Sequence, residues 1–333
     1  MAAKKNASPA GAKCTDRPER NPVEEGRIEV IIDGCLRGAT VFHPRAQFRN
    51  NPLQRLHVSR FWLRATSMLR VVIAAFTWLA LFARVGVAAE TEPTVPRFGQ
   101  NFTVAQPAIA MIWIAPGTFM MSSTHGAGDD TLVTLTRGCW LGQTEVTQGQ
   151  WQAVIENVPI PSFFKGSDRP VEQVAWAQVM EFCLKITERE RAAGRLPEGW
   201  AYTLPTEAQW EYACRAGTTG LFPGPLPTMA WYGANSGDQT HPVAQKQPNA
   251  WGLYDMQGNV LEWCADWYAA YPGGSVSDPA GPASGQFRVI RGGSWGSPAG
   301  LCRSALRSFG SLTHFRGLGF RLALAPQIAP PAR

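Results

Sequence analysis

The sequence predicts one mixed α+β domain with little regular secondary structure, extending over residues 107–326. Its apolar runs are short, and glycine- and proline-rich turns separate them. The 333-residue chain contains 13 Trp, 33 Gly and 26 Pro, a composition that suits many short elements with large aromatic side chains as anchors. No internal repeat or linker interrupts this region, and its length is sufficient to bury a sizeable hydrophobic core.

The first half of the domain is expected to begin with strands. Met111–Met121 predicts two short strands around a turn at Pro116-Gly117. The apolar run Val133–Leu141 predicts a further strand. Thr147 is a good N-cap for a helix that places Trp151 toward the core.

Two longer helices are expected next, followed by irregular chain. The first covers about Ala177–Ala193 and places Phe182 on its apolar face. The second begins at Thr206-Glu207-Ala208-Gln209, which has the spacing of a capping box, and ends at Gly217. Residues 218–290 are expected to consist mostly of turns, ordered by spaced tryptophans or by a bound ion.

The C-terminal stretch 288–324 contains the region where we expect the chemistry of the protein. Two short β-rich runs, Phe287–Ile290 and Gly319–Leu324, bracket a middle rich in Gly, Ser and Arg. Gly292-Gly293 allows a sharp turn or a close approach of the backbone. Trp295 then anchors the bend by burial.

An N-terminal segment with the pattern of a secretory signal peptide precedes the domain. From Met68 the chain has a charged start at Arg70, an apolar run Val71–Ala83 and small residues at 87 and 89. The run is shorter than the about 20 residues that a membrane span needs. We therefore expect a start at Met68, cleavage near Glu90, and a secreted or periplasmic protein with no stable membrane anchor. An uncleaved anchor with a basic cytoplasmic tail is the alternative.

The expected segments are 1–67, a non-native or disordered extension; 68–89, the signal peptide; 90–106, a linker; and 107–326, the folded domain. The net charge of +6 arises before the domain, because residues 1–89 carry 14 Lys/Arg and 6 Asp/Glu and the remainder carries 17 and 19. This balance gives no reason to expect a nucleic-acid partner. A basic nucleic-acid-binding arm at the N-terminus is an alternative that no known motif supports.

Six short motifs, rich in glycine and aromatic residues, follow one another through the domain. They are Leu141–Trp151, Arg169–Trp176, Leu204–Tyr212, Asn249–Asn259, Arg291–Trp295 and Gly319–Arg321. Together they resemble the formylglycine-generating enzyme (sulfatase-modifying factor) family. The resemblance implies a divergent C-type-lectin-like fold with low regular secondary structure, and an oxidoreductase of formylglycine-generating type if the protein is active. Fold does not by itself settle activity.

The family's enzymes are expected to hold copper(I), a soft metal that suits thiolates, between two cysteines spaced C-x4-C after the Gly-Gly-Ser-aromatic turn. Counting from Trp295 places Ser297 at the first position and Cys302 at the second. If the motif is aligned instead on Arg303 and the residues after it, the stretch is shorter and Cys302 falls outside the pair. Either alignment leaves one thiolate, so we do not expect copper, and Cys302 and Ser297 are only weak catalytic candidates.

The segment Asp255–Glu262 resembles the family's calcium loop, and the resemblance implies a structural Ca²⁺ ion. The implied ligands are the carboxylates of Asp255 and Glu262 and the backbone carbonyls of Gly258 and Val260. The alternative is that Asp255 caps a turn and Glu262 pairs with an arginine. A second family calcium site maps only partly, onto Asn235 and Ser236.

Five cysteines follow the signal segment, and an odd number leaves at least one unpaired in an oxidising compartment. They are Cys139, Cys183, Cys214, Cys264 and Cys302. The resemblance implies a Cys214–Cys302 disulfide, with isolated buried thiols as the alternative for the others. The histidines of the domain show no spacing typical of metal ligands.

Residues Gly296–Leu318 suggest a second class of function. They contain small, aromatic and arginine residues but no Lys, Glu, Gln, Met or Trp. This resembles the variable tail of retroelement-diversified ligand-binding proteins that share the fold, and ordinary family drift is the alternative. The residues expected to contact a ligand are Trp295, Arg307, Phe309, His314, Phe315 and Arg316.

Two functions are therefore expected. The first is an exported family member that lacks the paired copper cysteines and acts as a divergent oxidase or modifier of an exported peptide or protein. The alternative is a non-catalytic binding module of C-type-lectin type for an exported peptide, protein or glycan.

Overall fold

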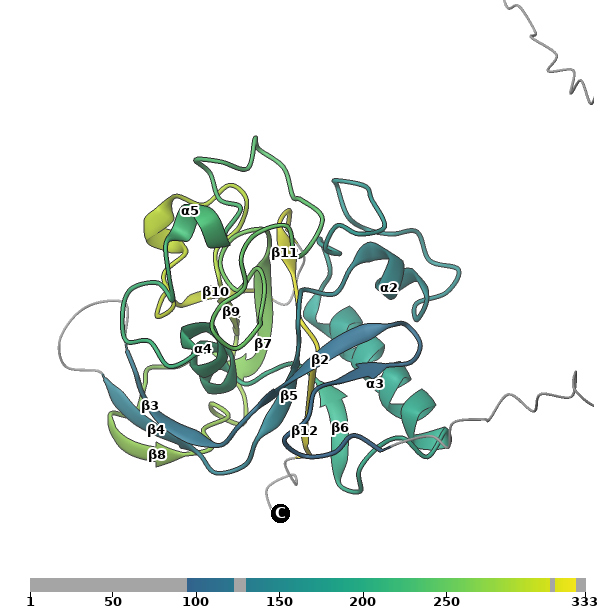
Figure 1. Cartoon of the computed structure of the whole chain (residues 1–333), viewed down its shortest axis with the longest axis horizontal. Coiled ribbons are helices and arrows are strands. Elements are labelled where there is room, and N and C mark those ends of the chain that lie inside the picture. The colour runs from purple at the N-terminus through teal and green to yellow at the C-terminus, as the bar shows by residue number, and fades with distance from the viewer. Residues whose placement is uncertain (1–94, 123–129, 312–314, 328–333) are drawn as a thin grey trace, which may run out of the picture. The chain divides into compact units, whose positions relative to one another are not determined.

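A five-stranded sheet with strand order β1-β2-β5-β12-β6 forms the centre of the domain. Its strands are β1 (Phe102–Val104), β2 (Ile109–Ile114), β5 (Cys139–Gly142), β12 (Ala323–Pro326) and β6 (Trp200–Thr203). All neighbouring pairs are antiparallel. The computed structural model describes residues 95–122, 130–311 and 315–327, and Figure 1 shows their arrangement.

Each face of this sheet packs against a different helix (Figure 1). Trp140 pairs with Leu324 across strands β5 and β12, and both side chains join Phe182 of helix α3 (Trp176–Ala192) in one hydrophobic cluster. Leu141 points to the opposite face and packs with Trp210 of helix α4 (Glu207–Arg215). The alternation of side chains along β5 therefore supplies both cores from one short strand.

Two smaller sheets complete the domain. One has the order β10-β9-β7-β11, and the other has the order β3-β4-β8. Their strands are β10 (Ser308–Gly310), β9 (Arg288–Arg291), β7 (Leu261–Trp267), β11 (Leu318–Gly319), β3 (Gly117–Met121), β4 (Thr131–Leu135) and β8 (Gly274–Ser277). The short helices are α2 (Gln148–Gln152), α5 (Leu226–Met229) and the 3-10 turn η1 (Ala299–Leu301).

The helix starts agree with the sequence. In the capping box of α4, the Gln209 backbone N–H donates to Thr206 Oγ1 over 3.1 Å, and the Thr206 N–H donates to Gln209 Oε1 over 2.9 Å. Thr147 caps α2 in the same way with Gln150. A side-chain cap of this kind contributes about 1 kcal/mol, so these local signals fix where the chain turns into helix.

Several strands differ from the prediction. The expected strand Val133–Leu141 is wrong as a single element, because β4 and β5 belong to different sheets and the chain breaks at Arg137-Gly138. A Cβ atom on Gly138 would lie 2.2 Å from the Trp113 ring, so the crossing between the sheets needs glycine. The C-terminal run divides into β11 and β12, and β7 lies within the stretch expected to be mostly turns.

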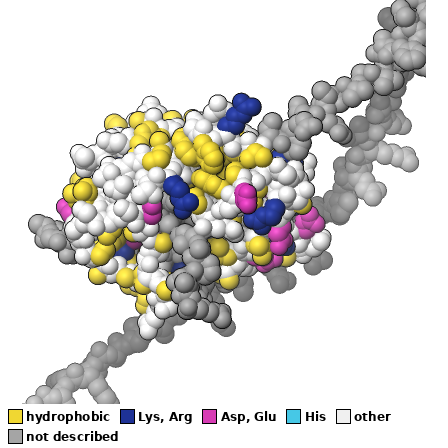
Figure 2. Space-filling model, turned by 90° about the horizontal axis from the view of Figure 1, so that it is seen from below, with side chains coloured by type: hydrophobic (Ala, Val, Ile, Leu, Met, Phe, Trp, Pro, Cys, Tyr) yellow, Lys and Arg dark blue, Asp and Glu magenta, His cyan; other side chains and the backbone are white. Residues whose placement is uncertain are grey.

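The surface of the domain is apolar in places. Figure 2 shows one face on which hydrophobic side chains gather in a band rather than lying scattered. In the part of the chain that the structure describes, no helix is long and apolar enough to cross a membrane. The expected signal segment 68–89 lies outside the described residues.

Candidate functional site

The Gly292-Gly293 turn joins strand β9 to the C-terminal loop and requires both glycines. Their φ angles are +99° and +76°, values that favour glycine. A Cβ atom on Gly293 would lie 2.6 Å from Cys302 Sγ, and one on Gly292 would lie 3.2 Å from the Met256 carbonyl oxygen. The turn therefore holds the start of the loop directly over the Cys302 side chain.

Two buried arginines anchor the ends of this loop. Arg291 pairs with Glu211 of α4 and donates to the Ser304 carbonyl oxygen over 2.9 Å. Arg321 binds Glu262 through two hydrogen bonds of 2.6 and 2.7 Å. Both guanidinium groups are fully buried, so their hydrogen bonds to carboxylates and carbonyls are needed to offset the cost of desolvation.

The weak catalytic candidates Ser297 and Cys302 do not form a copper-binding pair. Ser297 Oγ accepts the backbone N–H of Ser294 over 2.9 Å, which closes the turn. Cys302 is buried beside Leu226 and Ala230, and burial raises the pKa of its thiol to about 12. Copper(I) prefers soft sulfur ligands, and Ser297 supplies a hydroxyl in place of a second sulfur, so these residues do not form a thiolate pair.

The expected Cys214–Cys302 disulfide is not formed. Both cysteines are free and buried, and they belong to different hydrophobic clusters. Gln257 Nε2 donates to Cys214 Sγ over 3.0 Å and lies 3.4 Å from Ser304 Oγ. Cys214 is therefore satisfied by an amide rather than by a second sulfur.

The implied calcium ligands lie in a buried cluster of acids. Glu262 is paired with Arg321, which is the arrangement that the sequence offered as the alternative to a ligand role. Asp255 lies in a turn with φ +52°. Glu145, which the sequence did not single out, accepts the backbone N–H of Val260 over 3.0 Å. Burial contributes most to the raised pKa of Glu145, and the nearby carboxylates of Asp255 and Glu262 raise this pKa further.

Asp255 is the acid of this cluster that has an oxygen without a partner and therefore could bind a divalent cation. Three carboxylates, those of Glu145, Asp255 and Glu262, interact with the Arg321 guanidinium, and the Lys246 ammonium group also acts on Asp255. Asp255 Oδ2 accepts the Ala244 N–H over 2.8 Å, but its Oδ1 is buried without any partner. An orphaned carboxylate oxygen amid excess negative charge is what a Ca²⁺ ligand set needs. No group of three or more acidic, histidine or cysteine side chains in the described residues has metal-site geometry, so backbone carbonyls would complete the shell.

The side chains of the second, partial calcium site are hydrogen-bonded to other groups of the protein. Asn235 Oδ1 accepts the Tyr232 N–H over 2.9 Å, and its amide donates to the Ala230 carbonyl oxygen. The Ser236 hydroxyl donates to the Trp295 carbonyl oxygen over 2.7 Å. These bonds tie the segment to the Gly292–Trp295 turn.

The contacts of the candidate ligand residues place them in two sets. Arg307 forms a bidentate pair with Glu207 at 2.6 and 2.7 Å, and Phe309 packs against Tyr268 and Phe287. Trp295 and Arg316 belong to the other set, and the exposed Phe315 directly precedes Arg316 in the chain. His314 lies outside the described residues.

The second set contains two aromatic residues that sequence reasoning missed. Phe164 contacts Trp295 edge to face at 5.4 Å, and the Arg316 guanidinium lies 3.6 Å from the centre of the Phe163 ring. We call Phe163, Phe164, Trp295, Phe315 and Arg316 the aromatic face. Phe163 and Phe315 are 52% and 43% exposed, values that leave large apolar area available for binding.

A buried carboxylate holds the aromatic face together. Glu172 accepts the backbone N–H of Phe163, that of Phe164 over 3.3 Å, and that of Gly317 over 2.9 Å. It is fully buried. One side chain therefore links two loops that are almost 150 residues apart, a relation that no local sequence pattern reveals.

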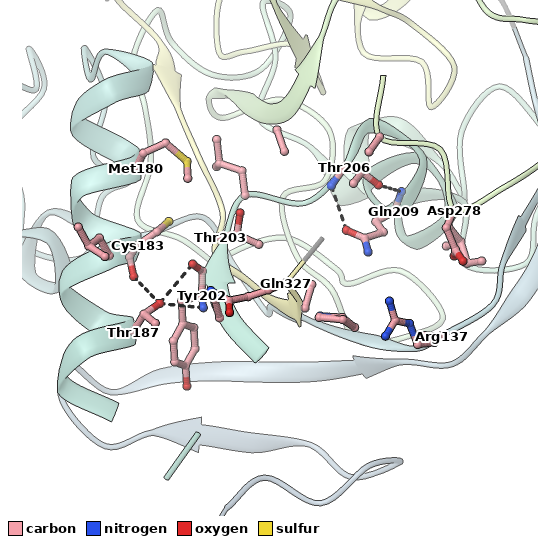
Figure 3. Close-up of a pocket in the computed structure, with 18 of the residues that line it drawn as sticks. Arg137, Met180, Cys183, Thr187, Tyr202, Thr203, Thr206, Gln209, Asp278 and Gln327 are labelled. Carbon is pink, nitrogen blue, oxygen red and sulfur yellow. Dashed lines mark hydrogen bonds between the residues drawn. The ribbon is translucent and has the colours of Figure 1, made fainter. Parts of the chain in front are cut away.

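A groove of about 710 Å³ lies on another part of the domain, between α3 and the edge strand β6 (Figure 3). Thr187 Oγ1 accepts the Tyr202 N–H over 2.9 Å and donates to the Cys183 carbonyl oxygen over 2.8 Å. These bonds occupy part of the polar edge of β6, so α3 protects the sheet edge. Burial raises the pKa of the Cys183 thiol, and the groove presents no activated nucleophile.

Comparisons with known proteins identify the domain. The Sulfatase-modifying factor enzyme 1-like domain matches residues 97–326. The chain is 31% identical over 232 residues to the "Chaperone protein LppX" of Paenibacillus barcinonensis, covering 56% of this chain and 78% of that protein. It is 34% identical over 189 residues to the "Formylglycine-generating enzyme" of Mus musculus, covering 50% of this chain and only 46% of the mouse enzyme.

Two solved structures have the same fold. "Treponema denticola variable protein 1" has a TM-score of 0.60 and 35% identity, over 67% of this chain and 98% of that protein. PvdO from Pseudomonas aeruginosa has a TM-score of 0.60 and 26% identity, over 69% of this chain and 99% of that protein.

Proposed function

The chain belongs to the sulfatase-modifying factor family, and from that membership we propose that it is an exported member that binds a peptide or protein through the aromatic face. The single observation that carries the proposal is the set of hydrogen bonds that the Glu172 carboxylate accepts from backbone N–H groups of both loops of this face. Exposed aromatic side chains on a backbone that is already ordered lose little conformational entropy on binding.

Thiolate-pair chemistry is not part of the proposed function. The loop has one buried thiol, that of Cys302, and the Ser297 hydroxyl closes a turn, so no pair of thiolates is present to hold copper(I). Formylglycine generation through copper therefore has no support in these residues.

The proposed partner is an exported peptide or protein with apolar and acidic residues. Arg316 and Lys165 are exposed beside the aromatic side chains, and their charges complement carboxylates. The relative LppX is called a chaperone protein, which supports a protein client. The name "variable protein" of the Treponema relative supports the proposal that Gly296–Leu318 varies as a recognition surface, whereas a glycan ligand has no such support.

A divergent modifier of an exported peptide or protein is the second candidate. The similarity to formylglycine-generating enzymes favours it. An enzyme of this kind must bind a peptide before modifying that peptide, so the aromatic face suits this function too. Any such chemistry would have to use groups other than a thiolate pair.

Export and calcium are part of the proposal. The segment 68–89 would direct export. Asp255 and the carbonyls of Gly258 and Val260 would hold a structural Ca²⁺, and Glu262 would join them by giving up hydrogen bonds from Arg321 or Trp210. The orphaned Asp255 Oδ1 supports the ion. N-terminal sequencing of the exported protein should begin near Glu90, and a start elsewhere would contradict cleavage at this position.

Capture of extracytoplasmic proteins by the purified full chain tests the binding function. Phe163→Ala and Phe315→Ala should each lower capture of a specific partner about tenfold, the effect of losing about 1.4 kcal/mol. The matched control is Phe309→Ala, because Phe309 is 50% exposed but lies outside the aromatic face. Equal losses in all three variants, or no loss in any, would refute the assignment.

Modification and metal binding are measured on the same preparation. Mass spectrometry of the captured partner should show no covalent change under the binding proposal, and a change would favour the modifier. Stoichiometric Cu(I) binding that Cys302→Ser abolishes would overturn the argument against a copper site.

A further inference from the structure

One wall of the groove between α3 and β6 is a stripe of helix α3. Met180, Leu184, Thr187 and Arg191 line the groove from this helix, and their spacing places them along one side of it. Leu184 is 55% exposed, so a large apolar side chain lies open along this wall. Arg191 adds a positive charge to the same stripe, so the wall combines apolar contact area with a cation.

The floor of the groove is made of small side chains. Ala201 of β6 and Ala325 of β12 are cross-strand partners and both line the groove, as do Ala265 and Ala280. Side chains of this size leave the volume of about 710 Å³ unfilled, and this volume is within the range of ligand sites. The floor therefore leaves room for a bound chain over this part of the sheet.

The charges of the groove leave two guanidinium groups without a carboxylate partner. Arg137, Arg191 and Asp278 are the charged residues that line it. Asp278 accepts both the backbone N–H and the hydroxyl of Thr136, so its carboxylate is already hydrogen-bonded. Arg191 donates to the neutral carbonyl oxygen of Trp200, and Arg137 forms no hydrogen bond or ion pair within the part of the chain that the structure describes. Both arginines are exposed and complement an anionic partner.

Three uncharged polar side chains also line the groove, those of Thr203, Gln209 and Gln327 (Figure 3). Gln209 Oε1 accepts the Thr206 N–H, but among the described residues nothing pairs with its NH₂ group or with the Thr203 hydroxyl. An alkyl chain that covered these groups would leave them without hydrogen bonds, which costs free energy. A peptide backbone offers them carbonyl oxygens and N–H groups, so the lining favours a peptide over a lipid.

From this lining we propose that the groove binds an extended peptide segment with apolar and acidic side chains. The apolar side chains of the segment pack against Leu184 and the alanine floor, and its carboxylates pair with Arg137 and Arg191. Figure 3 shows Arg137 across the groove from Met180 and Cys183 of α3, so cations flank the segment on both sides. The groove shares no lining residue with the aromatic face, so this site is separate from the proposed function.

The test measures the fluorescence anisotropy of two labelled peptides, AELAVEL and AQLAVQL, titrated with the full chain. The second peptide replaces both glutamates by glutamine and keeps the apolar side chains of the first. The acidic peptide should bind about tenfold more tightly, a difference of about 1.4 kcal/mol, as expected for two exposed ion pairs. Arg137→Gln and Arg191→Gln should each reduce this preference about threefold, and both positions are exposed, so the variants should fold.

Two further variants serve as controls. Arg97→Gln is matched to the groove variants, because Arg97 is exposed but does not line the groove, and it should leave both affinities unchanged. Leu184→Ser should weaken both peptides equally, since it removes apolar contact but no charge.

Absence of binding, equal binding of the two peptides, or a preference that both arginine variants retain would each overturn the proposal. Binding that appears only after removal of residues 328–333 would make the C-terminal segment of this chain the occupant and would also overturn it. Binding that Phe315→Ala abolishes and the arginine variants leave unchanged would place the peptide on the aromatic face instead, which would refute this site while supporting the proposed function.

Discussion

Replacing Glu172 by glutamine should loosen the aromatic face without changing the volume of the core. The carboxylate accepts three backbone N–H groups, from Phe163, Phe164 and Gly317. A glutamine amide has one accepting oxygen and one donating NH₂ group, so it cannot satisfy both loops. Hydrogen bonds to a charged group contribute about 1.5–3 kcal/mol each, and a buried N–H left unpaired costs a similar amount. We therefore expect the free energy of unfolding to fall by about 3 kcal/mol.

Urea denaturation followed by circular dichroism measures this loss, and amide hydrogen exchange locates it. Exchange should accelerate at Phe163 and Gly317. The control is Glu181→Gln, because Glu181 forms an exposed pair with Lys185 at 3.1 Å that contributes about 0.5 kcal/mol or less. If Glu172→Gln is as stable as this control and the two amides remain protected, the carboxylate does not order the face and the reasoning fails.

Three further changes should alter the stability of the domain. Removing calcium with a chelator should lower the melting temperature, and Asp255→Asn should abolish that response. Gly293→Ala should destabilise the domain by several kcal/mol, since its Cβ would lie 2.6 Å from Cys302 Sγ at a φ of +76°. Burial, with nearby Glu207, raises the pKa of Asp266 to about 7. The folded state therefore binds an extra proton between an unfolded pKa of about 4 and this value, and stability should fall as pH rises through that window. Asp266→Asn should flatten this decline in pH-dependent urea titrations.

The sequence was most informative where structure depends on neighbouring residues. The capping boxes at Thr147 and Thr206 and the Gly292-Gly293 turn depend on groups within a few positions of one another, and all three are found where expected. The mixed α+β fold and the family, which rest on many such local motifs in order, are confirmed in the same way.

The prediction failed where a partner lies far along the chain. Strand β7 lies in the stretch expected to be mostly turns. Its Glu262 and Asp266 are buried because Arg321 and the start of α4 satisfy them. Arg307 seemed available to a ligand, but Glu207, 100 residues earlier, occupies it. Phe163 and Phe164 lie in a proline-flanked loop without periodicity, and only contact with the C-terminal segment gives them a role.

These long-range pairs also fix the C-terminal loop to the rest of the domain. Arg291 and Arg321 fix its two ends in the core, and Glu172 fixes Gly317 from a separate loop. Between these ties, a Cβ atom added at Gly296 or Gly300 would meet nothing within 4 Å. Substitutions at such positions change the surface but not the packing that determines stability. Exposed positions such as Gly296 and Gly300 can therefore change without disturbing the buried contacts that Cys302, Ser304 and Arg307 make in the same loop.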